Sequence, residues 1–324
     1  MVYKNRARIY RCCWQKEEIL SKKIVLIITS SIDVTVDYII KKYNKVANFF
    51  RFNVDMLNQY EIGVVNEYGW YIKNKLSGFC LYKRDVYSIY YRKPIFPNLG
   101  DYEIQYRNMI QRDIDCFING IANDFEGKVL SKPYILRNTE NKVFQLLYAI
   151  KQGFNIPKSF IGNDNNIAEI FSGKCSIIKP LTIGKTYSNN CCEIYQTNMF
   201  SEFNEDISLT PIYLQLYQKK QYEVRLTIIN KDVYAVRIDC DNKIDWRKDY
   251  SSHRYTVIDC PLTIKNLCYK MLEDLELKFG AFDFIVDEED NWVFLEVNPN
   301  GQWQWLEEKL NLNISEKIVE YLVM

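Results

Sequence analysis

Histidine is almost absent from this sequence, since the 324 residues include only His253. A Ser-His-Asp triad needs an imidazole base, so this scarcity argues against that chemistry. The ten cysteines contain no C-x-x-C pair, and with a single histidine they offer no zinc-type ligand set. The vicinal pair Cys191-Cys192 could not bridge without strain. We therefore expect reduced thiols and a cytoplasmic protein.

Long apolar runs and an excess of one charge are missing as well. No apolar stretch approaches ~18 residues, which excludes a transmembrane helix at the level of sequence. The first residues, Met1 to Lys23, are basic but lack the apolar core and cleavage site of a signal peptide, and we interpret 1–22 as an N-terminal extension. Lys and Arg total 42 against 41 Asp and Glu, a net charge of +1. This balance predicts neither nucleic acid nor a membrane as partner.

The first predicted domain covers 23–127 and opens with an apolar, β-branched run. Lys22 to Thr29 is typical of a buried parallel strand, and the helix and strand that follow have βαβ spacing. The remaining elements expected here are the helix Val34–Tyr43, the strand Phe49–Asp55, further strands within Val64–Tyr91 and a helix over Tyr102–Phe125.

Two further lobes are predicted over 128–210 and 211–324, packed together because no Gly/Ser linker separates them. Gly153 is placed to cap the end of a helix that begins at Lys142. The other expected elements are the strands Cys175–Pro180, Ile212–Tyr217, Glu223–Ile229 and Val233–Asp239, the polar loop Leu181–Asn190, the acidic segment Glu202–Asp206, the helix Ile264–Lys278 and the hairpin Gly280–Pro299.

The hairpin carries the most specific signal in the chain. If its turn centres between Glu289 and Asp290, Asp283 lies opposite Glu296, and Glu296 shares a strand face with Asn298. Two carboxylates and an amide oxygen then converge, a set that suits Mg²⁺ bound together with substrate phosphates. The alternative is a solvated hairpin edge, but an unpaired carboxylate inside such apolar strands would be costly.

Lysines and arginines with positions suited to phosphate binding lie upstream. Lys179 ends an apolar strand beside a loop containing Gly184, and Lys142 begins a helix, where it could also be an ordinary solvated lysine. Arg225 and Arg247 are candidates to hold the γ-phosphate and an acyl phosphate, because guanidinium groups stabilise spread phosphoryl charge. Surface arginines on strands would look the same.

These residues resemble the ATP-grasp superfamily, whose C-terminal strands carry an acid followed by a Glu-x-Asn pair that holds Mg²⁺. The run from Phe294 to Trp303 is similar, more narrowly, to the maturases of microviridin-type peptides, the graspetides. The resemblance spans about Ile24 to the C-terminus, and Tyr91-Arg92-Lys93-Pro94 departs from its Arg-Arg-Pro by one residue. Its other matching segments are Phe50–Asp55, Ile178–Pro180, Glu223–Arg225, Asp245–Arg247, Leu306-Glu307 and Ile314-Ser315.

The resemblance implies an α/β protein with an ATP-grasp fold and an N-terminal, Rossmann-like pre-ATP-grasp domain. It implies ATP and Mg²⁺ as cofactors, with Lys142 matching the family's second ATP lysine and the strand of Gln215 and Leu216 matching the hinge that reads adenine. The partner would be a ribosomal precursor peptide made of a leader and a core. The oligomeric state stays open, with a homodimer as one candidate.

The implied reaction activates an Asp or Glu side chain of that peptide as an acyl phosphate, which a Ser or Thr hydroxyl or a Lys amine then attacks. The product is a side-chain ester or amide macrocycle. One alternative is an ATP-grasp ligase that adds amino acids to a protein tail or joins small metabolites. Another is a nucleotide-binding regulator without turnover, against which the intact Asp283, Glu296 and Asn298 argue.

Overall fold

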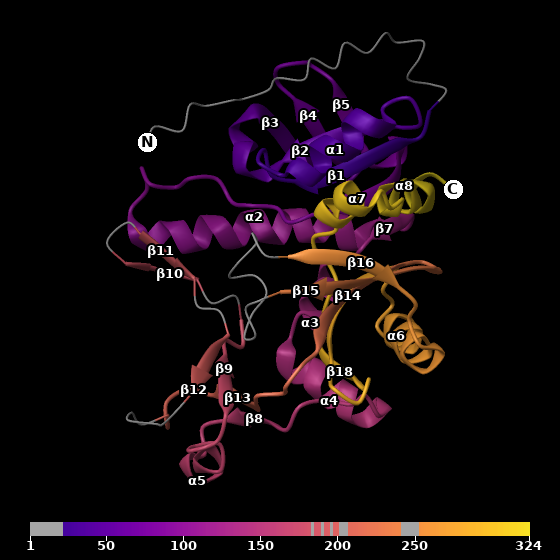
Figure 1. Ribbon diagram of the computed structural model, residues 1–324. Helices are drawn as coiled ribbons and strands as arrows, with labels where there is room; N and C mark the ends of the chain where they lie inside the picture. Colours follow the sequence, from indigo (N-terminus) through magenta and orange to yellow (C-terminus); the bar gives the residue numbers. More distant parts are fainter. Residues whose placement is uncertain (1–21, 183–184, 189–190, 195–196, 201–206, 241–252) are drawn as a thin grey trace. The chain divides into compact units, whose positions relative to one another are not determined.

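The computed structural model describes residues 22–182, 185–188, 191–194, 197–200, 207–240 and 253–324. The chain packs into two compact units (Figure 1): unit 1 is Met1–Tyr134 with Asn313–Met324, and unit 2 is Ile135–Leu312. Both units mix helices with sheets, which confirms the predicted α/β class. The finer boundaries at 127/128 and 210/211 stay predictions. Among the described residues no helix is long and apolar enough to cross a membrane.

Unit 1 is built on a four-stranded parallel sheet with the order β2-β1-β6-β7. Its strands are β1 (Ile24–Thr29), β2 (Asn48–Asn53), β6 (Val86–Tyr91) and β7 (Lys128–Leu130). Residues Val25 to Thr29 are all buried, as expected for a strand covered on both faces. The second predicted strand ends two residues early, because the 3-10 helix η1 (Val54–Gln59) begins there.

An antiparallel sheet and three helices complete unit 1. The last helix packs against β6, β7 and α1, so the C-terminal residues belong to the first unit, although they follow the whole of the second. Its buried side chains include Ile314, Ile318 and Leu322. The elements are α1 (Val34–Tyr43), α2 (Ile104–Asp124), α8 (Ile314–Val323), β3 (Tyr60–Val65), β4 (Gly69–Asn74), β5 (Cys80–Tyr82) and the 3-10 helix η2 (Lys83–Asp85).

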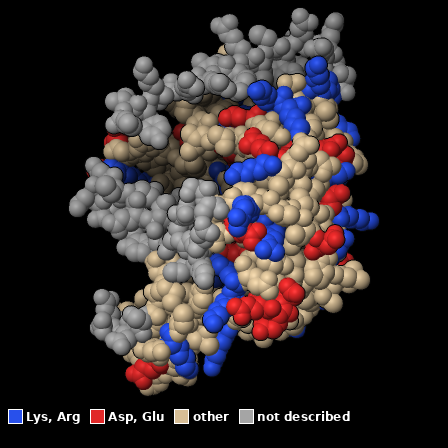
Figure 2. Space-filling view, viewed as in Figure 1, with Lys and Arg blue, Asp and Glu red and all other residues tan. Residues whose placement is uncertain are grey.

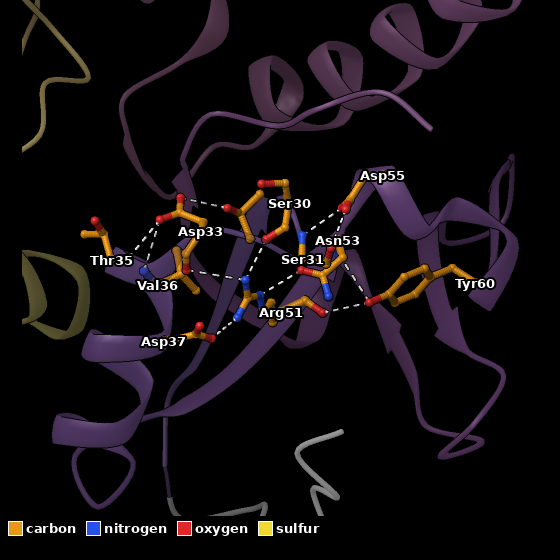
Figure 3. Close-up of polar contacts among 11 residues, drawn as sticks. Ser30, Ser31, Asp33, Thr35, Val36, Asp37, Arg51, Asn53, Asp55 and Tyr60 are labelled. Carbon is orange, nitrogen blue, oxygen red and sulfur yellow. Dashed lines mark hydrogen bonds and ion pairs between the residues drawn. The ribbon is translucent and has the colours of Figure 1, made fainter. Parts of the chain in front are cut away.

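Arg51 explains part of the Phe50–Asp55 motif, because it ties the loop after β1 to β2 (Figure 3). Its guanidinium donates to the Ser30 carbonyl at 2.6 Å and to Asn53 Oδ1 at 2.7 Å, and it forms an ion pair with Asp37. Asp55 accepts from the Ser31 amide at 2.8 Å. These bonds fix the loop at the carboxyl ends of two parallel strands.

Unit 2 contains two larger antiparallel sheets and a two-stranded ribbon. The smaller sheet has the order β12-β9-β13-β8, and the larger one has the order β16-β15-β14-β17-β18. Their strands are β8 (Ser159–Gly162), β9 (Ser176–Lys179), β12 (Asn198–Phe200), β13 (Ile212–Leu216), β14 (Tyr222–Ile229), β15 (Asp232–Asp239), β16 (Arg254–Ile258), β17 (Phe279–Val286) and β18 (Trp292–Asn298). The ribbon joins β10 (Lys185–Ser188) to β11 (Cys191–Ile194).

Helices α4 (Lys142–Gln152) and α6 (Leu262–Asp274) share a core with one face of the larger sheet. Asn141 caps α4 by accepting from the Phe144 amide at 3.1 Å, and Gly153 ends it with a φ of +79°, as predicted. The opposite face of the sheet carries Arg225 and Asp283 together with buried apolar side chains such as Val236. The remaining helices are α3 (Pro133–Thr139), α5 (Asn165–Glu169) and α7 (Gln304–Leu310).

The described surface mixes both charges. On the face drawn in Figure 2, lysine and arginine side chains are interspersed with aspartate and glutamate. None of the described cysteines forms a disulfide.

Candidate active site

The hairpin of β17 and β18 pairs Asp283 with Glu296, which confirms the predicted register. The turn itself differs from the prediction. Phe284 pairs with Phe294, so the strands near the turn are shifted by one residue, and an irregularity after Asp283 restores the predicted pairing. Leu295 is the extra residue of this bulge, a device that often re-aims side chains beside functional sites.

Three charged side chains occupy one row across three adjacent strands. Arg225 on β14 pairs with Asp283 on β17, which in turn pairs with Glu296 on β18. Arg225 Nη1 lies 3.2 Å from Asp283 Oδ1, and these two side chains are 8% and 7% exposed. Asn298 Nδ2 lies 3.3 Å from Asp283 Oδ2 and 3.4 Å from Glu296 Oε1. The predicted ligand set therefore does converge.

Some polar atoms of this face have no hydrogen-bond partner among the residues that the structure describes. They include Arg225 Nε and Nη1 and the hydroxyl of Thr227, which follows Arg225 on the same side of β14. Leaving buried donors unsatisfied is costly, so such atoms call for an explanation. A bound anion would satisfy the guanidinium.

A cleft of about 360 Å³, open solvent included, adjoins the row at Glu296. Helix α4, strands β9, β13 and β18, and the loop after α4 contribute its lining: Lys142, Gln145, Leu146, Ile156, Lys179, Tyr213, Gln215, Phe294, Leu295 and Glu296. The two predicted phosphate lysines thus meet in one cleft with a predicted metal ligand. Lys142 Nζ donates to the Pro180 carbonyl at 2.8 Å, and Lys179 Nζ lies 5.8 Å from the centre of the Tyr213 ring.

Gln215 places an amide oxygen in the wall of this cleft. The side chain is 1% exposed, and its Nε2 donates to Ser159 Oγ at 2.9 Å and to the Tyr213 hydroxyl at 2.8 Å. Within the described part of the chain, its Oε1 has no hydrogen-bond partner. Burial, reinforced by the Glu296 carboxylate, raises the pKa of Tyr213 to about 12, so this hydroxyl stays protonated.

The remaining predicted residues have different outcomes. The Leu216 amide donates to the Lys158 carbonyl at 2.9 Å, so any contact of Leu216 with a base would fall to its carbonyl or its side chain. Arg247, Gly184 and the acidic segment Glu202–Asp206 lie outside the described residues, and phosphate binding by Arg247 stays a prediction.

Gln145, Tyr213 and Thr227 are site residues that the sequence reasoning missed. Each had a signal in its spacing. Gln145 lies one helical turn after Lys142, and Tyr213 and Thr227 lie two residues from Gln215 and Arg225 on their strands. Side chains at such spacing share a face.

The donor chemistry suits Mg²⁺. No group of three or more His, Cys, Asp or Glu side chains in the described ranges could hold a metal alone. A cation here would rest on the carboxylates of Asp283 and Glu296, the Asn298 amide and oxygens of a bound phosphate, which is the mixed shell Mg²⁺ prefers. Asn298 would have to turn its amide, since Nδ2 now faces the carboxylates.

Known proteins share this fold over nearly the whole chain. The RiPP-associated ATP-grasp ligase of Chryseobacterium gregarium, solved with ADP and a leader and core peptide, has a TM-score of 0.83 and 25% identity, covering 93% of this chain and 96% of that one. The macrocyclase MdnB of Microcystis aeruginosa has a TM-score of 0.78 and 25% identity, covering 93% and 99%.

Sequence comparison finds ligases too. The alpha-aminoadipate–LysW ligase LysX of Sulfurisphaera tokodaii is 22% identical over 249 residues, which are 74% of this chain and 86% of that protein. The RimK-like ATP-grasp domain matches residues 139–322, more than half of the chain. With the carboxylate row, the two lysines and these matches in agreement, the chain belongs to the RimK-like ATP-grasp family and is an ATP-dependent ligase.

Proposed function

We propose that this ligase matures a ribosomally made precursor peptide by joining its side chains into ester or amide macrocycles. The observation that carries the proposal is the row of Arg225, Asp283 and Glu296 beside a cleft lined by Lys142 and Lys179. The row offers one cation and two carboxylates, and the cleft offers two further cations. Such a set suits phosphoryl transfer, which depends on charge neutralisation and positioning.

The cleft would hold ATP. Lys142 and Lys179 would contact its phosphates, and Gln215 Oε1 would accept from the amino group of adenine. Guanine presents an acceptor at that position, so the same oxygen would disfavour GTP. The apolar side chains of Leu146, Ile156 and Phe294 would exclude water from the base.

Asp283, Glu296 and Asn298 would hold Mg²⁺, which when bound neutralises phosphate charge and aligns the γ-phosphate for transfer. A side-chain carboxylate of the peptide attacks the γ-phosphorus, ADP leaves, and an acyl phosphate forms. Arg225, whose Nε has no hydrogen-bond partner among the described residues, would bind this acyl phosphate. A peptide hydroxyl or amine then attacks the acyl carbon, loses its proton and releases phosphate.

The peptide substrate is supported by two similar structures at 25% identity, one a ligase bound to a leader and core peptide and the other a macrocyclase. The similarity to LysX keeps a second candidate open, in which the activated carboxylate belongs to a protein tail or a small metabolite and the nucleophile is a free amine. Both use the same site and differ in the acceptor.

A product assay separates them. The enzyme is incubated with Mg²⁺, ATP and a candidate precursor peptide, sought as a short reading frame beside its gene, and the mass of the peptide is then measured by mass spectrometry. We expect the loss of one water for each bond formed, with one ADP per bond. ADP formation with free amino acids or a protein tail, and an unchanged peptide mass, would favour the second candidate instead.

A further inference from the structure

Helix α4 covers the outer edge of β18 at Val297 with one side chain, while the Phe294 amide of the same strand donates to the Asn155 carbonyl at 2.8 Å. β18 is an edge strand of the larger sheet, so among the described residues no neighbouring strand pairs with its outer side. Gln145 takes that place, since its Nε2 donates to the Val297 carbonyl at 2.9 Å and its Oε1 accepts from the Val297 amide at 2.9 Å. The side chain is 5% exposed. It therefore pairs with Val297 much as another strand would.

The two bonds hold the two peptide groups that matter for the proposed metal site. The Val297 N–H belongs to the peptide that joins it to Glu296, and the Val297 carbonyl belongs to the peptide that joins it to Asn298. Both proposed ligands thus branch from backbone that Gln145 fixes. A rotation of either peptide plane would swing a ligand away from the row.

The network allows only one orientation of the amide. Nε2 also donates to the Thr139 carbonyl at 2.7 Å, so its two hydrogens face two carbonyls while Oε1 faces an N–H. The flipped amide would oppose like groups at all three contacts. Lys142 begins the same helix one turn earlier and lines the same cleft.

We propose that Gln145 is a positioning residue, which sets the orientation of Glu296 and Asn298 toward Mg²⁺ without touching the metal. The proposal rests on the metal site of the proposed function. When a residue that hydrogen-bonds to metal ligands is removed, the protein typically loses ten- to a hundredfold in metal affinity.

The test is calorimetric titration of the full-length enzyme with ADP, with and without Mg²⁺. Gln145→Met keeps the length of the side chain but removes every bond to Val297. We expect it to lose about tenfold in ADP affinity with Mg²⁺ present and nothing in its absence. Met271→Ala is the control for lowered stability, because it opens a cavity in the core of unit 2 at α6. It should leave the ADP affinity unchanged both with and without Mg²⁺. If Gln145→Met does not fold, Gln145→Glu, which keeps the acceptor for the Val297 amide, is measured in its place.

Hydrogen exchange gives a second readout. The Val297 amide should exchange faster in Gln145→Met than in Met271→Ala at matched global stability. An equal loss of ADP affinity with and without Mg²⁺ would make Gln145 a direct nucleotide contact and overturn the proposal, as would unchanged affinities. Glu296→Gln, titrated in parallel, separates the two claims. If it too leaves the Mg²⁺ dependence intact, the proposed metal site itself is wrong.

Discussion

Glu296 lies where the carboxylate row and the proposed nucleotide cleft meet. It pairs with Asp283 across the hairpin, lies 3.4 Å from the Asn298 amide and lines the cleft with both lysines. In the proposed site its side chain would connect Mg²⁺ in the row to phosphates in the cleft.

Replacing Glu296 by glutamine tests this connection. The variant keeps its shape but loses the negative charge, and we expect ADP formation to slow roughly 10²-fold, a loss of ~3 kcal/mol in transition-state stabilisation. The measurement is ADP release with saturating peptide. Glu289→Gln, at the exposed tip of the same hairpin, should keep the parent rate. Equal rates for both variants would remove Glu296 from the site.

Lys179 gives a prediction about binding. Lys179→Ala should weaken ATP binding about tenfold, or ~1.4 kcal/mol, because a cation facing the phosphates is lost from the cleft. Lys174→Ala is the matched control, an exposed lysine just before the same strand. The two affinities can be compared by calorimetry, and a similar affinity in both variants would contradict the assignment.

At the residue level the sequence predicted the parts of the site that depend on strand alternation. Asp283, Glu296 and Asn298 follow from a two-residue period and an estimated turn. The pairing came out right although the turn centre was misplaced, because the bulge at Leu295 compensates by one residue. The role of Gln145 could not be found this way, because its bonds to Val297 join residues 152 positions apart.

At the level of elements, the loop after β18 depends on a glycine. A Cβ at Gly301 would lie 2.5 Å from Ala281 Cβ and 3.3 Å from Asn298 Cβ, so the loop folds back onto the hairpin that carries the proposed ligands. No side chain fits there without movement of the backbone.

Gly301→Ala should therefore cost about 1–3 kcal/mol of unfolding free energy and lower turnover, as overpacked sites do. Gly120→Ala is the control, because a Cβ at Gly120 in α2 meets nothing within 4 Å and alanine favours a helix by ~1 kcal/mol. Urea unfolding gives both values. Adding Ala281→Gly should restore part of the loss, and its failure to do so would show that the close approach is not the cause.

Element types were predicted better than element ends. The strand before η1 was drawn two residues too long, since Val54 and Asp55 continue its polar-apolar alternation into a 3-10 turn. The break between the predicted strands Glu223–Ile229 and Val233–Asp239 is confirmed, and Asn230 turns the chain there with a φ of +54°, which asparagine tolerates. The edge strand β16 was missed, since its pairing with β15 is long-range and its side chains are mostly exposed.

At the level of the whole molecule, the chain returns to its first unit at the end. Helix α8 supplies Ile314, Ile318 and Leu322 to the core of unit 1, and Ser315 lies 2.8 Å from the Tyr43 hydroxyl. Linear lobe boundaries drawn from sequence do not anticipate such a return. No local pattern shows which sheet an amphipathic helix will cover.

Ile318→Ala should lower the unfolding free energy of unit 1 by about 2–5 kcal/mol, because the Ile318 side chain is fully buried. Hydrogen exchange resolves the two units, and amides of β1 and β6 should exchange faster while those of β14 and β17 keep their rates. Val34→Ala, exposed on α1, should change neither. Faster exchange in β17 alone would contradict the assignment of α8 to unit 1.

The central claim, that a peptide carboxylate is activated as an acyl phosphate and then captured within the same peptide, can be tested with one labelled substrate. The Asp and Glu side chains of the neighbouring peptide are enriched in a heavy oxygen isotope, and the enzyme is supplied with Mg²⁺ and ATP. Mass spectrometry then follows the isotope. The account predicts one heavy oxygen in the released phosphate for each water lost from the peptide. Unlabelled phosphate, or labelled phosphate with a peptide that has lost no water, would contradict it.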